Sequence, residues 1–536
     1  MMAKIRIRRA ELDLCFERFI IDAEDDFFPD PLRYKDLRCV RDSIVHQIQK
    51  TLTVVINQNN IAYTVMHHYP WDVPKENFVI REGCCFHPYD VVVFHFVLNR
   101  LLPLIEPKLS KARYSYRIGK TTSKKLFGYN PTQNWVTFKN DIRDCFSNNS
   151  SYQYLVSTDV AGFFENIPIR IFKKRLLQIS NQNEGQAIEL LCSMLNEYSA
   201  SKYSGMPQNY DPFSYLCTAF LDFLDKELEA KSITHFRYVD DIKVACRTET
   251  DAKKAIIQII QTLRTAHLNL STAKTDIIPV NSEKFRNMLK EFPPFLHDID
   301  NAVRNKQKRT INNLYPPLVS YTKQVMRQRK EDFDERLFRA CIWRIVKINY
   351  FKNINKLDLV SIGKKCLKLL DSMPSRTNTL LRFLVLHKNR AYVQDALCAL
   401  LKDTVYAWQE MLIWYLLIQC DRIKNPNILT LAKLRARDSG YDEAARNYIY
   451  IFLGKHGDYQ DRTYIASLFS LAQSFRAQRS ILIAIQEYED RNAIYNPIIR
   501  ANSDPILVGL VRYIKQLSTP EYVDVDKNIA SDIAFS

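Results

Sequence analysis

The stretch HFRYVDDIKVAC, residues 235–246, places two adjacent aspartates between runs of β-branched and aromatic residues. The alternation on both sides of the pair predicts a β-hairpin with Asp240 and Asp241 at its turn. Neighbouring carboxylates repel each other, so each disfavours the ionisation of the other unless water or a cation surrounds them. The stretch is therefore either a hydrated hairpin tip or one half of a metal site.

A third acid favours the metal site. The segment YQYLVSTDV, residues 152–160, predicts a buried strand with Asp159 near its end. A sheet can bring the end of this strand beside the hairpin turn, and three carboxylates there suit Mg²⁺, which prefers oxygen ligands. Two such ions about 4 Å apart stabilise the attacking and leaving oxygens in phosphoryl transfer. We expect two Mg²⁺ ions, with Mn²⁺ as a substitute.

The composition indicates a large, helix-rich and basic protein. The chain has 536 residues, which predicts two or three domains, and only 11 glycines, which disfavours many tight turns. Its formal net charge is +17. That charge is either a soluble basic surface or the mark of a polyanionic partner. Clusters such as RNKQKRT (304–310), RQRK (327–330) and GKTTSKK (119–125) favour nucleic acid.

The cysteines and apolar runs indicate a soluble cytoplasmic protein. The twelve cysteines show no zinc-like spacing. Cys84, Cys85 and His87 lie close together, as metal ligands or, more simply, as buried small groups. The basic start of the chain lacks the apolar core of a secretory signal. The runs VVVFHFVL (91–98) and MLIWYLLI (411–418) are too short to span a membrane.

The predicted secondary structure of the chain changes near residue 290. Before it, predicted strands alternate with helices, which indicates an α/β sheet domain. After it, almost only helical segments follow, as in helical-pair solenoids or bundles. We expect a partly helical N-terminal extension (1–80), a sheet domain (81–290), a proline-containing linker (291–320) and a helical repeat-like domain (321–536).

Four ordered stretches resemble the palm motifs A to D of reverse transcriptases. They are STDVAGFFENI (157–167), GMPQNYDPFSYL (205–216), FRYVDDIKVAC (236–246) and LNLSTAKTDIIP (268–279). ARYSYRIGK (112–120) resembles the basic finger motif upstream of the palm. The resemblance covers about residues 80 to 285 and implies right-hand-type fingers and palm, nucleic-acid and dNTP binding, and RNA-directed DNA polymerase activity.

The resemblance implies roles for the acids and for one aromatic side chain. Asp159 and Asp240 would hold the two metal ions, with Asp241 as the third acid and the Val160 carbonyl as a further ligand. Phe164 stands where the family has a bulky gate under the sugar, which would exclude a 2′-hydroxyl. Packing in the core is the alternative for Phe164.

Motif B and the hairpin imply template and nucleotide contacts. Gly205, Pro207 and Gln208 match a turn that lies along the template and the incoming nucleotide, and Tyr238 matches a template or primer contact. The family usually has glycine where Asn209 stands. Asparagine tolerates a left-handed φ better than other non-glycine residues, which would preserve the turn.

Four basic residues are the candidates for phosphate contacts. Lys274 matches a motif D lysine that would neutralise leaving pyrophosphate, although most surface lysines have no such role. Arg117, supported by Lys120 and Arg113, would clamp the triphosphate through its planar guanidinium. The alternative for Arg117 is a basic fingertip that touches template phosphates.

The helical second half resembles one subgroup, the bacterial abortive-infection and defence-associated reverse transcriptases. Their C-terminal region is an α-helical, HEAT-like repeat array, and DFFPDPLRYKD (26–36) is similar to a segment found in them. The resemblance implies antiphage defence and homo-oligomers. In some members it implies a non-coding RNA partner, synthesis without a conventional template, or priming from a protein hydroxyl.

Two classes of function therefore compete. The leading hypothesis is an active DNA polymerase that adds dNTPs to a 3′-hydroxyl or a protein hydroxyl. The rival is a nucleic-acid-binding scaffold with a non-catalytic palm and a helical interaction array. The presence of all three acids together with the phenylalanine favours the enzyme.

Overall fold

The acidic hairpin lies at the edge of a four-stranded antiparallel sheet in the computed structural model. Strand β4 (His235–Tyr238) pairs with β5 (Asp241–Cys246), β5 with β3 (Tyr154–Asp159), and β3 with β6 (Asp276–Pro279). The hairpin and the strand before Asp159 are confirmed. The structure describes residues 5–24, 29–58, 60–118, 123–127, 131–149, 151–199, 204–329, 332–351, 357–501 and 504–524.

The two faces of this sheet pack into different cores. On one face, Leu155 and Phe236 contact Phe138 and Phe146 of helix α4 (Pro131–Asn148). On the other face, Val156 and Val244 join the large core formed with the helices around the sheet. Those helices are α5 (Phe163–Asn166), α6 (Ile169–Ile179), α7 (Gly185–Tyr198), α8 (Asp211–Phe220), α9 (Asp222–Ala230) and α10 (Glu249–Arg264). Burial on both faces fixes the strand register.

The N-terminal helices belong to the core of the sheet domain. Helices α1 (Arg9–Glu24), α2 (Arg41–Ile56) and α3 (Pro88–Ile105), with the 3₁₀ turn η1 (Lys35–Val40), contribute buried residues to it. The segment Pro88–Lys108 is long and apolar enough to cross a membrane, but 72% of its most apolar window is buried inside the protein. Burial against α1, α7 and α8 makes it a core helix of this domain.

A second hairpin was not predicted. Strands β1 (Tyr69–Pro74) and β2 (Ile80–Cys85) pair antiparallel on either side of the turn η2 (Glu76–Phe78). Trp71 and Val73 are buried in the core of the C-terminal helices. The boundary expected at residue 80 therefore falls inside this hairpin.

The expected linker is helical. Residues 291–320 contain α12 (Pro294–Arg304) and most of α13 (Lys308–Val325), whose Leu296 and Tyr315 are buried in the C-terminal core. Pro294 occupies the first turn of α12, where a missing N–H is tolerated. Pro316 and Pro317 lie inside α13. The prolines therefore do not mark a break between domains.

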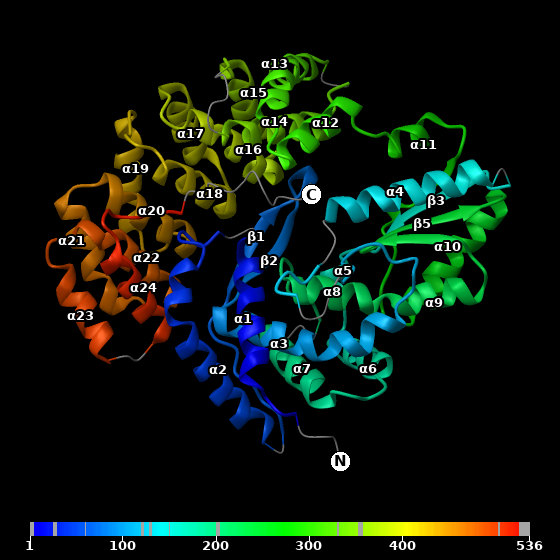
Figure 1. The fold of residues 1–536 in the computed structure, drawn as a ribbon, viewed down its shortest axis with the longest axis horizontal. Helices are drawn as coiled ribbons and strands as arrows, with labels where there is room; N and C mark the ends of the chain where they lie inside the picture. Colours follow the sequence, from blue (N-terminus) through cyan, green and yellow to red (C-terminus); the bar gives the residue numbers. More distant parts are fainter. Residues whose placement is uncertain are drawn as a thin grey trace.

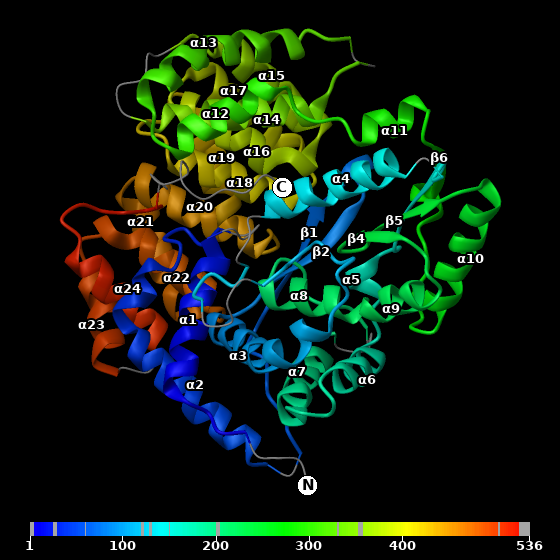
Figure 2. The ribbon, with the colours of Figure 1, turned by 45° about the vertical axis from the view of Figure 1, so that its right-hand side comes forward.

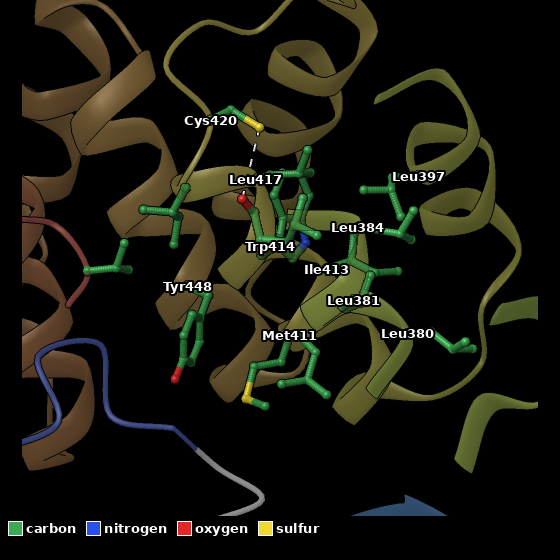
Figure 3. Close-up of a cluster of buried hydrophobic side chains, with 14 of the residues drawn as sticks. Leu380, Leu381, Leu384, Leu397, Met411, Ile413, Trp414, Leu417, Cys420 and Tyr448 are labelled. Atoms are coloured by element: carbon green, nitrogen blue, oxygen red, sulfur yellow. Dashed lines mark hydrogen bonds between the residues drawn. The ribbon is translucent and has the colours of Figure 1, made fainter. Parts of the chain in front are cut away.

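The remaining described chain is an arc of helices. They are α14 (Glu335–Asn349), α15 (Val360–Ser372), α16 (Thr377–Leu384), α17 (Ala391–Asp403), α18 (Ala407–Ile418), α19 (Pro426–Arg437), α20 (Glu443–His456), α21 (Tyr459–Ser467), α22 (Phe475–Ala484), α23 (Arg491–Ala501) and α24 (Pro505–Gln516). Helix α11 (Glu283–Met288) leads from the sheet to this arc (Figure 1). Leu381 and Leu384 of α16 lie near Ile413 and Trp414 of α18 in its core (Figure 3).

The arc returns to the N-terminal part of the chain. Helix α24 lies beside η1, where a Cβ on Gly509 would stand 2.4 Å from the Val40 side chain. The buried guanidinium of Arg479 pairs with Asp36 at 2.5 Å and with Asp30 at 3.0 Å. Figures 1 and 2 both show α22 and α24 near α1 and α2. The last helices of the arc are thus anchored to the first part of the chain.

Candidate active site

The sheet brings the three predicted acids together. Asp159, the last residue of β3, is directly paired with Asp241, the first residue of β5. Asp240 occupies the turn just before it. Val239 in this turn has φ +59°, an unfavourable value for a β-branched residue. Ser115 accepts a hydrogen bond from the Val239 N–H at 2.9 Å, which helps to hold the turn in this conformation.

A buried ion pair supports the hairpin from behind. Arg237 of β4 and Asp225 of α9 are both fully buried, and the Arg237 Nε donates to the Asp225 carboxylate at 2.8 and 3.0 Å. The same guanidinium donates to the Val239 carbonyl at 2.7 Å. The charged pair thus connects α9 to the backbone of the acidic turn. Breaking such a pair leaves a buried charge without compensation.

The acids lie in one shared negative field. Burial raises the pKa of Asp240 to about 6, and the negative charges of Asp159 and Asp241 add to this effect. Burial also raises the pKa of Asp241, although Lys243 opposes the rise. Such mutual repulsion is the electrostatic condition that a bound cation relieves.

Two ammonium groups contact the acids. Lys274 donates to Asp159 Oδ2 at 2.7 Å, and its side chain is 67% exposed. Lys243 is nearly buried and donates to Asp241 Oδ1 and, at 2.8 Å, to the Ser157 hydroxyl. Lys274 therefore contacts one of the acids, as its match to motif D implies. Lys243 is a second cation at the acids, and the sequence analysis did not identify it.

The donor chemistry fits a hard divalent cation. Carboxylate oxygens are the ligands that Mg²⁺ takes up, and these carboxylates already attract ammonium groups. Within the described ranges, no group of three or more His, Cys, Asp and Glu side chains is arranged to hold an ion. The inference of a divalent-cation site therefore rests on the chemical type of the donors and on their closeness to one another.

Phe164 and motif B form one connected unit. Phe164 is half-buried beside the fully packed Phe163, with ring centroids 5.2 Å apart. The Met206 N–H donates to the Phe164 carbonyl at 2.8 Å, which ties motif B to the segment after Asp159. Gly205 has φ +97° and Asn209 has φ +83°. The prediction that asparagine preserves the turn is confirmed.

Several predicted contact residues are packed inside the protein. Pro207 and Gln208 are buried. Tyr238 is half-buried, and its ring packs edge-on against Trp135 of α4, with centroids 4.9 Å apart. These side chains are therefore held by packing within the protein.

Of the predicted basic clamp, the structure describes Arg113 and Arg117, and both make contacts within the protein. Arg113 is 0% exposed, pairs with Glu106 at 2.7 Å and lies over the Tyr215 ring. A fully buried guanidinium cannot contact a nucleotide, so the structure argues for a packing role. Arg117 donates to the carbonyls of Ser110 and Lys111. Lys120 lies outside the described residues.

One other basic residue, Lys75, lies in the electrostatic field of the acids, and the sequence reasoning missed it. Lys75, just after β1, lies 3.7 Å from Glu165 Oε1. Burial lowers the pKa of Lys75, and the neighbouring charge of Arg81 lowers it further. The opposing attraction of Glu165 and Asp240 places Lys75 in the field of the acids. The sequence signal was the pair of cations, Lys75 and Arg81, on either side of ENFVI (76–80). The sequence analysis assigned ENFVI to the N-terminal extension.

Residues 93–311 match the family model described as reverse transcriptase (RNA-dependent DNA polymerase). The matched segment contains the three acids, Phe164, motif B and Lys274. None of the curated proteins compared with the chain matches it. The chain thus carries a reverse-transcriptase-type domain, which indicates an RNA-directed DNA polymerase, a nucleotidyltransferase.

Proposed function

We propose that the protein synthesises DNA by adding dNTPs to a 3′-hydroxyl or a protein hydroxyl, with Asp159, Asp240 and Asp241 at the reacting centre. The observation that carries this proposal is the convergence of the three acids at one end of the sheet, where burial and then the charges of Asp159 and Asp241 raise the pKa of Asp240. Phosphoryl transfer needs concentrated charge neutralisation at such a point.

The acids would hold two Mg²⁺ ions. Asp159 and Asp240, with Asp241 and the Val160 carbonyl, would supply the oxygen ligands. The ions, when bound, supply charge neutralisation for the attacking and leaving oxygens. Lys274 contacts Asp159 and is largely exposed, so it is placed to neutralise charge on the leaving pyrophosphate.

The nucleotide would lie between the acids and the β1–β2 hairpin. Lys75 and Arg81 would take the triphosphate role expected of Arg117 and Lys120, because Lys75 lies in the field of Asp240. Phe164 is half-buried and linked to motif B, a position from which a ring would exclude a ribose 2′-hydroxyl. These roles would select dNTPs.

The helical arc would adapt the polymerase to antiphage defence in the cytoplasm. The arc stands where the resemblance implies a HEAT-like repeat domain, and its helices follow one another around the sheet domain (Figure 1). Oligomer formation, a non-coding RNA partner and synthesis without a conventional template belong to this proposal. The formal net charge of +17 supports a nucleic-acid partner.

The test uses purified, nuclease-treated protein with Mg²⁺ and labelled dNTPs, with and without an RNA template and DNA primer. We expect Asp240→Asn to lower synthesis by about 10²–10³-fold or more, because electrostatic stabilisation of that size is lost. Asp276→Asn on the neighbouring strand β6 is the matched control, since its exposed partner is Lys284.

The outcomes separate the hypotheses. Aspartate-dependent product without added template would indicate untemplated or self-primed synthesis, and its sensitivity to protease would reveal a protein primer. Product only with template and primer would indicate a conventional reverse transcriptase. An equal rate for Asp240→Asn would contradict the assignment of the acids, and no synthesis under either condition would favour the scaffold hypothesis.

A further inference from the structure

An apolar surface is exposed where the β1–β2 hairpin meets the helical arc. Phe78, Val79 and Ile80 are consecutive in the chain and are 61%, 57% and 51% exposed. Val405, in the loop between α17 and α18, is 84% exposed. Consecutive exposed apolar side chains of this size mark interaction sites more often than ordinary surface. These four residues are called the tip patch below.

The hairpin and the arc are bonded together at the tip patch. The Tyr406 hydroxyl, next to Val405, donates to the Phe78 carbonyl at 3.1 Å. Arg376 pairs with Glu76 at 2.5 Å. Figures 1 and 2 both show β1 and β2 between α18 and the four-stranded sheet. The two parts of the chain that carry the tip patch are therefore held together by these contacts.

The backbone at the tip is held in an unfavourable conformation. Asn77 has φ +59° and Phe78 has φ +61°. A left-handed conformation costs a residue other than glycine about 1–2 kcal/mol. Phe78 nevertheless stays mostly exposed, so burial within this chain offsets little of that cost. Such strain is typical of segments that present a side chain to a ligand.

Basic groups lie next to the tip patch in the chain. Lys75 and Arg81 flank its hairpin residues, and Lys402, at the end of α17, comes shortly before Val405. Lys402 also lines a shallow depression of about 550 Å³ on the arc. The other residues that line this depression are Leu431, Leu434, Arg435, Arg437, Asp438 and Tyr441. Cations thus border an apolar and aromatic surface.

We propose that the tip patch binds single-stranded nucleic acid on its path between the acids and the helical arc. Phe78 stacks on a base, while the flanking lysines and arginines neutralise phosphates. Aromatic rings combined with a basic groove are how proteins hold single strands without reading their sequence. The inference rests on the proposed function, because the strand bound at the tip patch would be a nucleic-acid strand of the proposed DNA synthesis.

The test measures the affinity of the full-length protein for dye-labelled 20-nucleotide oligo-U and oligo-dT by fluorescence anisotropy, without dNTPs. We expect Phe78→Ala to raise Kd about 5- to 100-fold, since stacking contributes about 1–3 kcal/mol per base. Phe78→Trp should bind nearly as well as the unmodified protein. Leu471→Ala, at a residue 73% exposed elsewhere on the arc, should not change Kd.

A second variant tests the phosphate contacts. Lys402→Gln should weaken binding of both oligonucleotides and reduce the slope of log Kd against log salt by about 0.7. Unequal losses for oligo-U and oligo-dT would identify the bound strand as RNA or DNA. An unchanged Kd for both Phe78→Ala and Lys402→Gln would overturn the proposal.

Two further outcomes separate this inference from its premise. Asp240→Asn should bind the oligonucleotides normally while synthesis is lost, which would support both proposals. Protein that synthesises no DNA but loses binding on Phe78→Ala would support the tip patch and contradict the polymerase. If Phe78→Ala instead abolished self-association and left Kd unchanged, a second copy of the chain would cover the patch and the inference would be wrong.

Discussion

The two β-hairpins of this protein differ in how they are stabilised. The β4–β5 hairpin is a part of the four-stranded sheet, packs into the cores of the sheet domain and rests on the buried Arg237–Asp225 pair. The β1–β2 hairpin forms a separate two-stranded sheet, and its Trp71 is buried among residues of the C-terminal helices. One hairpin thus belongs to the domain that carries the acids, and the other packs into the core of the helical arc while its neighbour Lys75 lies 3.7 Å from Glu165 of the sheet domain.

This difference explains why one hairpin was predicted and the other was not. The residues of the β4–β5 hairpin alternate in character, and its two strands are adjacent in the chain. A short stretch of sequence therefore predicts their pairing. Trp71 pairs locally with Gly83, but the core residues around its side chain lie hundreds of residues later, and no local pattern reports them. The comparison predicts that the two hairpins respond differently to substitution.

The largest expected effect is on the buried pair behind β4–β5. Asp225→Asn should destabilise the protein by about 3–5 kcal/mol, because Arg237 is left buried without a counter-charge. Urea unfolding followed by circular dichroism measures this. Asp276→Asn, which removes an exposed ion pair with Lys284, should change stability by less than about 1 kcal/mol. Equal effects of the two variants would contradict the role given to the pair.

The same carboxylate should make the protein acid-sensitive. Burial alone raises the pKa of Asp225, but Arg237 and then His235 lower it by more, so the net pKa is below its ordinary value. A depressed pKa in the folded state stabilises the protein above the unfolded pKa of about 3.9. That contribution is lost as the pH falls further, and Asp225→Asn should remove this part of the acid sensitivity.

The next effect concerns the core of β1–β2. Trp71→Ala should destabilise the protein by about 3 kcal/mol, because a large buried side chain is removed from the helical core. Hydrogen–deuterium exchange of residues 69–85 should increase, while that of β4 and β5 should not. Phe78→Ala on the same hairpin is the control and should leave stability nearly unchanged, since its ring is exposed.

A smaller effect is expected where the first hairpin reaches the acids. Lys75→Ala should raise the KM for dNTPs about tenfold, because one charge-assisted contact to the triphosphate is lost. Lys75→Arg should retain most of the affinity. Steady-state incorporation on a defined template gives both constants. An unchanged KM would return the triphosphate role to Arg117 or Lys120.

A further prediction sharpens the comparison through pH. Burial raises the pKa of Asp90, near the start of α3 and just after β2, to about 7. Its carboxyl accepts hydrogen bonds from the Tyr63 hydroxyl at 2.9 Å and the Met66 N–H at 3.0 Å. A raised acid pKa means that stability falls as the pH rises from about 4 to 7, the opposite sign from Asp225. Asp90→Asn should flatten this slope in unfolding measurements.

Much of the sheet domain was predictable because its signals are local. The hairpin at Asp240, the strand ending on Asp159 and the tolerance of Asn209 for a left-handed φ were all predicted from short stretches and are confirmed. Residues 291–320, expected to form a linker, instead contain α12 and most of α13, which accommodate the prolines. Arg113 shows that a basic motif in the sequence does not say whether its side chain reaches solvent.

The sequence by itself determined the acids, their order and the strand and turn that carry each of them, because alternation and turn chemistry act over a few residues. Only the tertiary structure decided that β1–β2 joins the helical core and that Lys75 lies near Asp240. Only it placed the Phe78 carbonyl within hydrogen-bond distance of the Tyr406 hydroxyl, at the junction with the arc. Such contacts join residues far apart in the chain, and their free energy comes from burial and charge pairing that no local stretch contains.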